Sequence, residues 1–427
     1  MSSAIASVHG RRIWDSRGRP TVEVEVTLAS GAKGRGMAPA GASRGRFEAV
    51  DRRDGAAALG GFGVSDALRG IDDEIAAALI GMDALGQTQI DARLIELDGT
   101  EDKSRLGGNA LIATSLAVLH AAAADRRQPL WAYVANGRTV SVPIPEIQIF
   151  GGGAHAGRRI DIQDLMVMAP SAKSFDEALE MTAEVYLAAG RIMAKRGHLA
   201  GVADEGGHWP VFESNEAALD TLVAAIEEAG FVPGEQVAIS LDIAASEFGS
   251  GGRYKLGLER RELDSDAMCE LMLRWCDRYP IGSMEDPLSE DDAAGLRRFT
   301  AAVGGRVQVI GDDYLVTNAA RIAKAAEQRD VNAVLIKLNQ AGTVTETYAA
   351  LEAGKNAGFG TIVSARSGET EDTTIVHLAV GWNAGQLKVG SFSRSERMAK
   401  WNEAIRVEEA LGDAAQFAGM SMLGRRR

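Results

Sequence analysis

A short apolar run followed by an amphipathic helical pattern recurs at least six times in the C-terminal half of the sequence, about every 25–45 residues. The apolar runs read QVAISLD, IGSMED, VQVIGDD, AVLIKLNQ, TIVSARS and QLKVGS. Strands that alternate with helices at this spacing predict a parallel sheet whose strands are joined by crossover helices. Six or more such units favour a closed barrel over an open sheet, so we predict an α/β fold.

The N-terminal part of the chain has a different order, with strands first and helices after them. Three β-like runs come first, of which TVEVEVTL alternates strictly between apolar and polar residues. Three helical patterns follow, starting near Val64, Thr88 and Asn109. A block of strands followed by helices predicts an α+β domain. Because no low-complexity linker separates the two parts, we expect them to pack tightly.

Composition narrows the class of partner. The 427 residues carry 46 Lys and Arg against 59 Asp and Glu, a formal net charge of −13. This balance disfavours nucleic acid and anionic membranes as partners, whereas a local cluster of cations still permits a small anionic substrate. The sequence also lacks a P-loop, a CxxC pair and an HExxH helix, which leaves P-loop ATP hydrolysis and zincin chemistry without support.

The two cysteines and the N-terminus favour a cytoplasmic protein. Cys269 and Cys276 lie seven residues apart in a helical pattern. At 1.5 Å per residue their separation is roughly 10 Å, too long for a disulfide, so we expect reduced thiols. The first residues lack the apolar segment of a signal peptide, and no apolar stretch reaches the length of a bilayer span.

Charged residues follow the six apolar runs directly. In a (β/α) barrel the carboxyl ends of the strands lie on one face, where active sites are built. Six successive strands would therefore bring three carboxylate positions and three cations to one mouth. In chain order these residues are Asp242, Glu285 with Asp286, Asp312 with Asp313, Lys337, Arg366 and Lys388.

These residue types suit one kind of chemistry. Asp242, Glu285 and Asp312 offer hard oxygen ligands, which favour Mg²⁺ over zinc. Lys337 would face this metal, and we expect the nearby cation of Lys388 to lower its pKa toward that of a base. A base lysine with divalent metal removes a proton alpha to a carboxylate, and the metal stabilises the resulting enediolate.

Two glycine-rich segments add candidates. VADEGGHWP places Asp204 and Glu205 in a turn where a carboxyl group can approach a ligand closely. GGGAHAG places His155 in a loop, and we expect Asp164 to end the strand that follows. A single histidine or glycine-rich loop is a weak signal by itself. These residues are therefore candidates only if they lie beside the charged residues at the mouth of the barrel.

Several long phrases together resemble the enolase (phosphopyruvate hydratase) family, nearly from end to end. They include DSRGRPTVEVEV, PAGASRGRFEAVDRRDG, GAHAGRRIDIQD, VADEGG, SMEDP, IKLNQAGTVTET and SARSGETEDTT. The resemblance implies an N-terminal α+β domain, residues 1–138, capping a modified (β/α)8 TIM-like barrel, residues 139–427, in a homodimer or higher homo-oligomer. It also implies Mg²⁺ and a glycolytic reaction, the reversible dehydration of 2-phosphoglycerate to phosphoenolpyruvate.

The resemblance implies a role for each site residue. Asp242, Glu285 and Asp312 would hold the first Mg²⁺, and Ser43 would close over a second. Lys337 would take the C2 proton, and Glu205 would help the C3 hydroxyl to leave. Three further residues complete the catalytic set, Asp164, Lys388 and His155, of which Lys388 would neutralise the substrate carboxylate. The substrate contacts would be Arg366 and Ser367 at the phosphate, with Ser43 and Gln163.

The sequence departs from the family pattern at several positions. Ala365 stands where the family has histidine, and Asp164 stands where it has glutamate, which retracts that carboxyl by one methylene. A misplacement of about 1 Å can reduce a rate by about 10²-fold. The other departures are Ala40 and Arg44, which flank the segment 41–43, and Arg158 and Arg159, which follow the loop that holds His155.

Three interpretations follow from these departures. The first is a working enolase that tolerates them. The second is a paralogue similar to carboxyphosphonoenolpyruvate synthases, in which Ala365 opens space and Arg44, Arg158 or Arg159 supplies charge for a different phospho- or phosphono-carboxylate. The third is a catalytically weakened enolase with a binding role, and the basic run 425–427 is the sequence feature that supports it.

Overall fold

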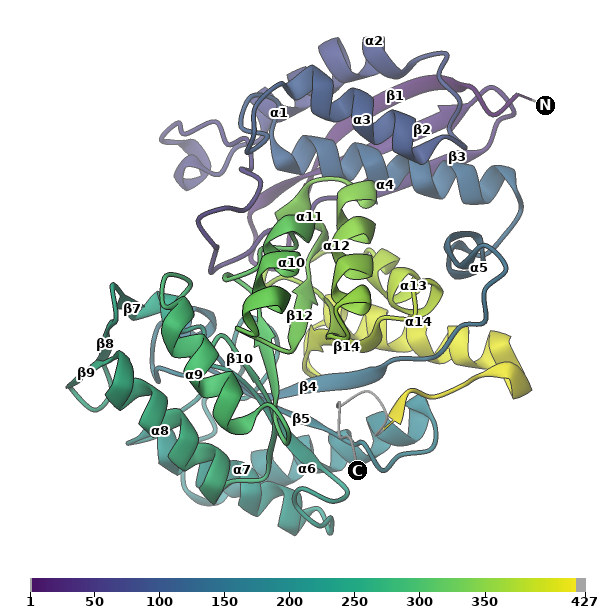
Figure 1. Cartoon of the computed structure of the whole chain (residues 1–427). Helices are drawn as coiled ribbons and strands as arrows, with labels where there is room; N and C mark the ends of the chain where they lie inside the picture. The colour runs from purple at the N-terminus through teal and green to yellow at the C-terminus, as the bar shows by residue number, and fades with distance from the viewer. Residues whose placement is uncertain (1, 420–427) are drawn as a thin grey trace.

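The computed structural model describes residues 2–419, with the N-terminal domain above a barrel (Figure 1). The basic run 425–427 lies outside the described residues. A three-stranded antiparallel sheet begins the chain, as predicted, and helices follow it. The strands are β1 (Ile5–Trp14), β2 (Pro20–Leu28) and β3 (Lys33–Met37). The helices are α1 (Ser65–Arg69), α2 (Ala76–Leu79), α3 (Gln87–Asp98), α4 (Gly108–Asp125) and α5 (Leu130–Ala135), with a π-helical turn at Gly70–Ile75 and a 3₁₀ turn at Ala58–Gly61.

Helix α4 packs directly on the sheet because β3 presents glycines to it. In β3 the buried positions are Gly34, Gly36 and Met37, and exposed Lys33 and Arg35 alternate with the two glycines. A Cβ atom at Gly34 would overlap the backbone of α4 at Ala117 and Ala121. The alternating KGRGM sequence therefore sets how closely this helix approaches the sheet.

Eight strands form a closed barrel, which confirms the predicted α/β barrel class. Their order around the barrel is β10-β11-β12-β13-β14-β4-β5-β6. The bounds are β4 (Ile144–Gly151), β5 (Asp164–Met168), β6 (Ala238–Asp242), β10 (Ile281–Glu285), β11 (Gln308–Gly311), β12 (Ala333–Ile336), β13 (Gly360–Ser364) and β14 (Gly385–Gly390).

One strand runs against the others, and this corrects the position predicted for Asp164. Strand β5 pairs antiparallel with both β4 and β6, while the other neighbouring pairs in the barrel are parallel. Asp164 begins β5 instead of ending a strand, and lies opposite Gly151 and Asp242. Because β5 is reversed, its first residue still lies at the rim where the other strands end.

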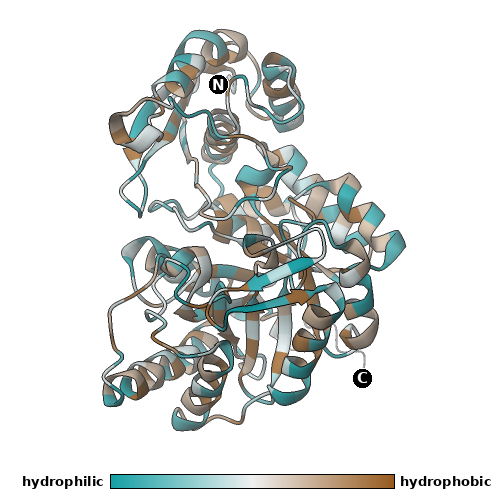
Figure 2. Ribbon diagram, turned by 90° about the vertical axis from the view of Figure 1, so that its left-hand side faces the viewer, coloured by the Kyte–Doolittle hydropathy of each residue, from teal (hydrophilic) through white to brown (hydrophobic). Residues whose placement is uncertain are grey.

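Helices surround the barrel and carry both hydrophobic and hydrophilic residues along their lengths (Figure 2). Six of them begin at a side-chain cap that accepts a backbone N–H, namely Ser174, Ser214, Asp264, Asp292, Asn318 and Thr343. The bounds are α6 (Phe175–Lys195), α7 (Asn215–Glu228), α8 (Ser265–Arg278), α9 (Ala293–Val303), α10 (Ala319–Gln328), α11 (Leu338–Ala341), α12 (Val344–Asn356), α13 (Thr374–Gly381) and α14 (Ser395–Leu411).

Short elements lie between these helices and strands. A small antiparallel sheet, which the sequence pattern did not predict, precedes α8. Its strands are β7 (Gly249–Ser250), β8 (Arg253–Leu256) and β9 (Arg261–Asp264), and 3₁₀ turns occur at Gly153–Ala156, Ala245–Glu247 and Gly412–Ala414. Cys269 and Cys276 are free and buried on α8, as expected. Within residues 2–419, no helix combines the length and apolarity needed to cross a bilayer.

Candidate active site

The rim formed by the strand ends gathers the six charged positions predicted from the sequence. Asp242 and Glu285 end β6 and β10, and Asp312 follows β11. Lys337 follows β12, while Arg366 and Lys388 come from the ends of the next two strands. All six side chains are buried, so each charge depends on its neighbours for compensation.

The two lysines lie among the carboxylates. Lys388 Nζ is 3.0 Å from Asp242 Oδ2, 2.8 Å from Glu285 Oε2 and 3.3 Å from Asp164 Oδ2. Lys337 Nζ donates a hydrogen bond to Asp312 Oδ2. Each lysine therefore contacts at least one carboxylate of the rim across the barrel mouth.

Lys388 acts to lower the pKa of Lys337, as expected, but the net shift of that pKa is upward, which corrects the prediction of a lowered value. Burial acts to lower the pKa of Lys337, but the charge of Asp312 outweighs it and the pKa is raised. Burial is likewise outweighed at Lys388, where Asp242 and Glu285 raise the pKa well above its usual value. The sequence pattern paired the two lysines with each other, whereas the closed barrel brings Asp312 against Lys337 and three carboxylates against Lys388.

The carboxylates of the rim fit a hard divalent cation. Asp242, Glu285 and Asp312 come from three neighbouring strands, and Glu285 Oε1 is buried without a hydrogen-bond partner among the described residues. Burial and the nearby charge of Asp242 raise the pKa of Glu285 well above its usual value, so a positive ion would relieve the repulsion. An all-oxygen donor set of this kind suits Mg²⁺.

A second acidic cluster lies beside this trio. Among the described residues, the carboxylates of Asp286, Asp312 and Asp313 bring oxygen atoms within 4.8 Å of one another, closer than the predicted trio. Asp286 accepts the backbone N–H groups of Asp312 (3.0 Å) and Asp313 (2.8 Å). Asp286 therefore orients the turn that follows β11 and with it the carboxylate of Asp312.

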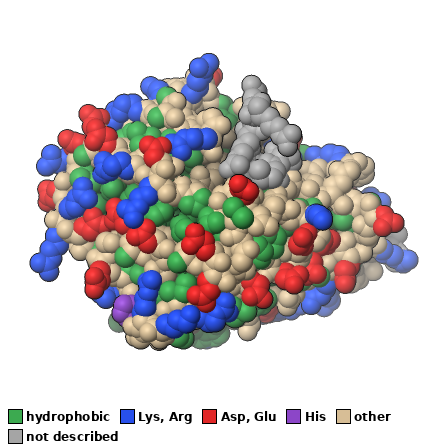
Figure 3. All heavy atoms as spheres, turned by 90° about the horizontal axis from the view of Figure 1, so that it is seen from below, with side chains coloured by type: hydrophobic (Ala, Val, Ile, Leu, Met, Phe, Trp, Pro, Cys, Tyr) green, Lys and Arg blue, Asp and Glu red, His purple; other side chains and the backbone are tan. Residues whose placement is uncertain are grey.

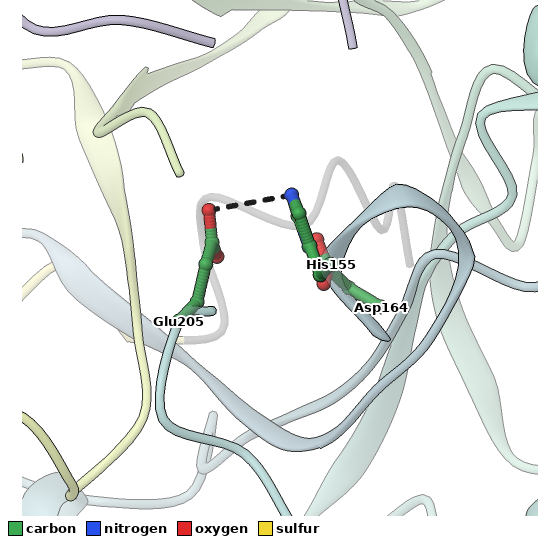
Figure 4. Close-up of side chains that lie close together, drawn as sticks. All are labelled: His155, Asp164 and Glu205. Atoms are coloured by element: carbon green, nitrogen blue, oxygen red, sulfur yellow. Dashed lines mark hydrogen bonds and ion pairs between the residues drawn. The ribbon is translucent and has the colours of Figure 1, made fainter. Parts of the chain in front are cut away.

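His155 lies between Asp164 and Glu205 (Figure 4). Its Nδ1 is 2.8 Å from Asp164 Oδ1, and its Nε2 is 3.7 Å from Glu205 Oε1. Burial acts to lower the pKa of His155, but the two carboxyl groups outweigh it and raise the pKa to about 9. The imidazole is therefore protonated near neutral pH, so it is hydrogen-bonded to Asp164 and ion-paired with Glu205, and metal binding by His155 is disfavoured.

A loop of the N-terminal domain covers the rim. Ala42 N donates to Ser367 Oγ at 2.6 Å, and Arg366 Nη2 donates to Ser43 O at 3.0 Å. Ser43 Oγ accepts from Gln163 Nε2 at 3.3 Å, and the same Nε2 lies 3.1 Å from Asp242 Oδ2. The four predicted substrate contacts thus line one cavity together with Asp242, Lys337 and Lys388 of the rim, while Glu285 and Asp312 do not line it.

Three residues of the site were missed by the sequence reasoning. Glu48 pairs with Arg366 at 3.1 Å, Gln340 donates to Asp312 Oδ1 at 2.8 Å, and Arg17 donates to Ser367 Oγ at 3.3 Å. Each lies inside a sequence phrase that resembles the enolase family, and this resemblance is the feature that could have identified them. Their types alone gave no hint, because each acts on a residue distant in sequence.

The arginines of the second interpretation lie away from the cavity. Arg158 and Arg159 are exposed, and Arg158 pairs at 2.8 Å with Glu247. Arg44 donates to Ala49 O at 3.2 Å, and none of the three lines the cavity around Ala365. The extra charge expected from these arginines is therefore not supplied to the site in this structure.

The fold and the site define a barrel enzyme whose active site combines carboxylates and lysines at the strand ends. Two family models match the chain, the enolase N-terminal domain over residues 5–134 and the enolase C-terminal TIM barrel domain over residues 139–425. The chain is also 50% identical over 416 residues to Enolase 1 of Desulfitobacterium hafniense (strain Y51), covering 97% of this chain and 95% of that protein. The chain belongs to the enolase family and is an enolase-type hydro-lyase.

Proposed function

We propose that this protein catalyses the Mg²⁺-dependent, reversible dehydration of 2-phosphoglycerate to phosphoenolpyruvate. The observation that carries the proposal is the meeting of Lys337 and Glu205 at one buried cavity. Elimination needs a base for the proton at C2 and an acid for the hydroxyl at C3, and these two side chains offer both. We further propose that the enzyme acts in the cytoplasm as a homodimer.

Lys337 is the proposed base. In its neutral form Nζ would take the C2 proton, while Asp312 favours the charged form and so opposes that state. Mg²⁺ held by Asp242, Glu285 and Asp312 would supply positive charge that favours the neutral lysine and stabilises negative charge on the substrate carboxylate. Lys388 would pair with that carboxylate.

Glu205 is the proposed acid. Burial raises its pKa and the charge of His155 partly offsets this, so Glu205 holds a proton more readily than an exposed glutamate does. Asp164 is the opposite case, because the charges of His155 and Lys388 outweigh burial and lower its pKa. Two carboxyl groups with pKa values pushed apart are the pattern expected for a proton donor and a charged supporting group.

The phosphate would meet Arg366 and Ser367. Arg366 is held by Glu48 and by Asn339 Oδ1 at 2.8 Å, and Ser367 Oγ accepts two hydrogen bonds. The raised pKa of Arg366, which Glu48 causes against the effect of burial, keeps the guanidinium charged. A phosphate would replace carboxylate and carbonyl partners with stronger, doubly charged ones.

Direct assay of phosphoenolpyruvate formation from 2-phosphoglycerate tests the proposal. We expect turnover with Mg²⁺, and a loss of about 10²–10⁴-fold in kcat for Lys337→Ala, which removes the base. The exposed Lys255 provides the matched control, since Lys255→Ala removes a lysine far from the rim and leaves kcat unchanged. Absence of turnover in the unaltered enzyme would overturn the proposal.

The variant Ala365→His addresses the altered-substrate interpretation. If the missing histidine limits the reaction with 2-phosphoglycerate, the variant gains activity with this substrate. No gain, together with normal turnover in the unaltered enzyme, would show that Ala365 is a tolerated departure. A phosphono-carboxylate turned over in place of 2-phosphoglycerate would support the paralogue instead.

A further inference from the structure

Gln148 on β4 contacts two segments of the site, Asp164 and the turn after Glu205, from outside the substrate cavity. Its side chain is fully buried and does not line the substrate cavity. Gln148 Nε2 donates a hydrogen bond to Asp164 Oδ1, and its Oε1 accepts the backbone N–H of Gly207 at 2.8 Å. Gly207 belongs to the turn that carries Glu205. The side-chain amide of Gln148 therefore contacts both the Asp164 carboxylate and the turn that holds Glu205, the proposed acid.

The turn that carries Glu205 is also held by Tyr186 Oη, which donates to Gly206 O at 3.2 Å, and by backbone contacts. Asp204 N donates to His155 O at 3.1 Å, and Ser391 N donates to Glu205 O at 2.9 Å. These contacts position the chain but make no bond to the Asp164 side chain. Gln148 and His155 are the two side chains that connect Asp164 to the region of Glu205, and only His155 reaches the cavity.

Two glycines leave room for the long amide. A Cβ atom at Gly207 would lie 2.6 Å from Gln148 Oε1, and one at Gly151 would lie 3.1 Å from the same atom. The contact at Gly207 is too short for a side chain while Gln148 keeps its place, and at Gly151 an added Cβ atom would also lie 2.5 Å from the Cβ atom of Ala203. The local packing thus reserves space for a glutamine.

We propose that Gln148 is the positioning residue that compensates for the short Asp164 and maintains the spacing of Asp164, His155 and Glu205. The inference rests on the proposed roles of Asp164 and Glu205. Asp164 places its carboxyl one methylene closer to β5 than glutamate would. The glutamine side chain of Gln148 spans the space from β4 to reach it. Without this hydrogen bond, Asp164 is free to turn further toward Lys388, already 3.3 Å from Oδ2.

The proposal predicts that shortening Gln148 by one methylene is compensated when Asp164 is lengthened by one methylene. Gln148→Asn shortens the amide, so it cannot reach Asp164 and Gly207 together, and we expect kcat to fall about 10–100-fold with little change in KM. Asp164→Glu alone crowds the amide and also lowers kcat. The double variant Gln148→Asn/Asp164→Glu restores the summed length, and we expect its kcat to return to within about 5-fold of the starting enzyme.

Gln308→Asn is the matched control. Gln308 is also a buried barrel glutamine and exchanges hydrogen bonds with Gln386 at 2.7 and 3.1 Å, but it contacts neither Asp164 nor the turn at Gly207. Its shortening lowers the melting temperature as a buried truncation does. We expect Gln308→Asn to lose stability without the loss of kcat predicted for Gln148→Asn. Adding Asp164→Glu should not restore the stability of Gln308→Asn.

A second readout does not depend on the substrate. The His155 ring protons facing Asp164 and Glu205 give nuclear magnetic resonance signals that His155→Gln removes and thereby assigns. We expect Gln148→Asn to broaden or shift them through faster exchange with water, the double variant to restore them, and Gln308→Asn to leave them unchanged. If Gln148→Asn does not fold, the isosteric Gln148→Glu takes its place, since it removes the donor toward Asp164 without changing the volume.

The two readouts separate failure of this inference from failure of the proposed function. No turnover of 2-phosphoglycerate by the starting enzyme would overturn the proposed function, and the His155 signals would still test the positioning role. Unchanged kcat and unchanged signals in Gln148→Asn would overturn the inference. A double variant no better than the product of the two single losses would also overturn it, because the two residues would then act independently.

Discussion

At the residue scale, burial acts on every charged group of the rim, and the neighbouring charges decide the outcome. Glu205 and Asp164 are both buried and both within reach of His155, yet the pKa of Glu205 is raised and that of Asp164 is lowered. The difference arises because Asp164 forms a 2.8 Å contact with His155 and also faces Lys388, whereas Glu205 is 3.7 Å from the imidazole. Contacts that differ by about 1 Å thus separate two chemically similar carboxyl groups.

Glu146 provides a pH test at the same scale. It is fully buried one layer below the rim, accepts hydrogen bonds from Ser240 and Gln386 at 3.0 Å each, and burial raises its pKa to about 6. A carboxyl with a raised pKa stabilises the fold below its unfolded value near 4.5 and loses this contribution as pH rises through 6. We therefore expect Glu146→Gln to gain stability relative to the unaltered enzyme between pH 4.5 and 7.5, by about 2 kcal/mol.

Chemical denaturation at the two pH values measures this difference. The matched control is Glu262→Gln, which removes an exposed carboxyl group on β9 in place of a buried one, and we expect no comparable gain in stability. A constant difference for Glu146→Gln would contradict the burial argument.

The buried thiols give a second prediction at the residue scale. Burial raises the pKa of Cys276 to about 12, and the pKa of Cys269 is raised for the same reason. Because the thiolate is the reactive form, we expect neither residue to be alkylated by iodoacetamide at pH 8 until the protein is denatured. Mass spectrometry of native and denatured samples measures this, and rapid labelling of the native protein would count against the described packing of α8.

At the element scale, alternation along the strands sorts the barrel interior into layers. Positions two residues apart on a strand share a face, so Ser240 lies below Asp242, Ser283 below Glu285 and Gln386 below Lys388. Ser283 donates to Gln308 at 3.1 Å, and Gln308 is bonded to Gln386. A connected polar layer therefore supports the charged rim, where many barrels have apolar layers.

The contact between β3 and α4 supplies a prediction for a single element. We expect Gly34→Ala to destabilise the protein by at least about 2 kcal/mol. The added methyl group overlaps the backbone of α4, so β3 and α4 would have to move apart to accommodate it. Gly305→Ala is the control, since a Cβ atom there meets nothing within 4 Å. Thermal melting of the two variants compares them, and equal melting temperatures would exclude the close approach of β3 and α4.

At the scale of the whole molecule, the net charge of −13 divides into surface and rim. On the face away from the N-terminal domain, acidic and basic side chains are interspersed (Figure 3). The rim is different, because carboxylates and cations there are buried and in contact. An acidic protein can thus bind a small anion through a few buried cations and the metal that its carboxylates favour.

Metal binding is the prediction that belongs to this scale. We expect Mg²⁺ to raise the melting temperature, since an ion at 100 times its Kd stabilises the folded state by about 2.7 kcal/mol. Glu285→Gln removes a buried carboxylate from the rim and should abolish the shift, whereas the exposed Glu262→Gln should preserve it. Calorimetry with Mg²⁺ and with a chelator measures the shift, and an equal shift in both variants would place the ion elsewhere.

The sequence by itself determined the class of the fold and the residues brought to the rim. Both follow from local periodicity, because a charge directly after an apolar strand lies at the strand's end in any barrel. The enolase phrases added residues such as Ser43 and Glu205, whose loops carry no periodic signal. Each strand end and each phrase is a local feature of the sequence, and the barrel class follows from the repetition of such features along the chain.

Only the tertiary structure decided what those residues do to one another. The reversal of β5 put Asp164 at the rim, the surrounding carboxylates raised the pKa values of both lysines, and Gln148 came to bridge two distant segments. The reason is physical. Pairing direction, electrostatic potential and hydrogen bonding all depend on distances between residues far apart in the chain, and those distances are set only when the barrel closes.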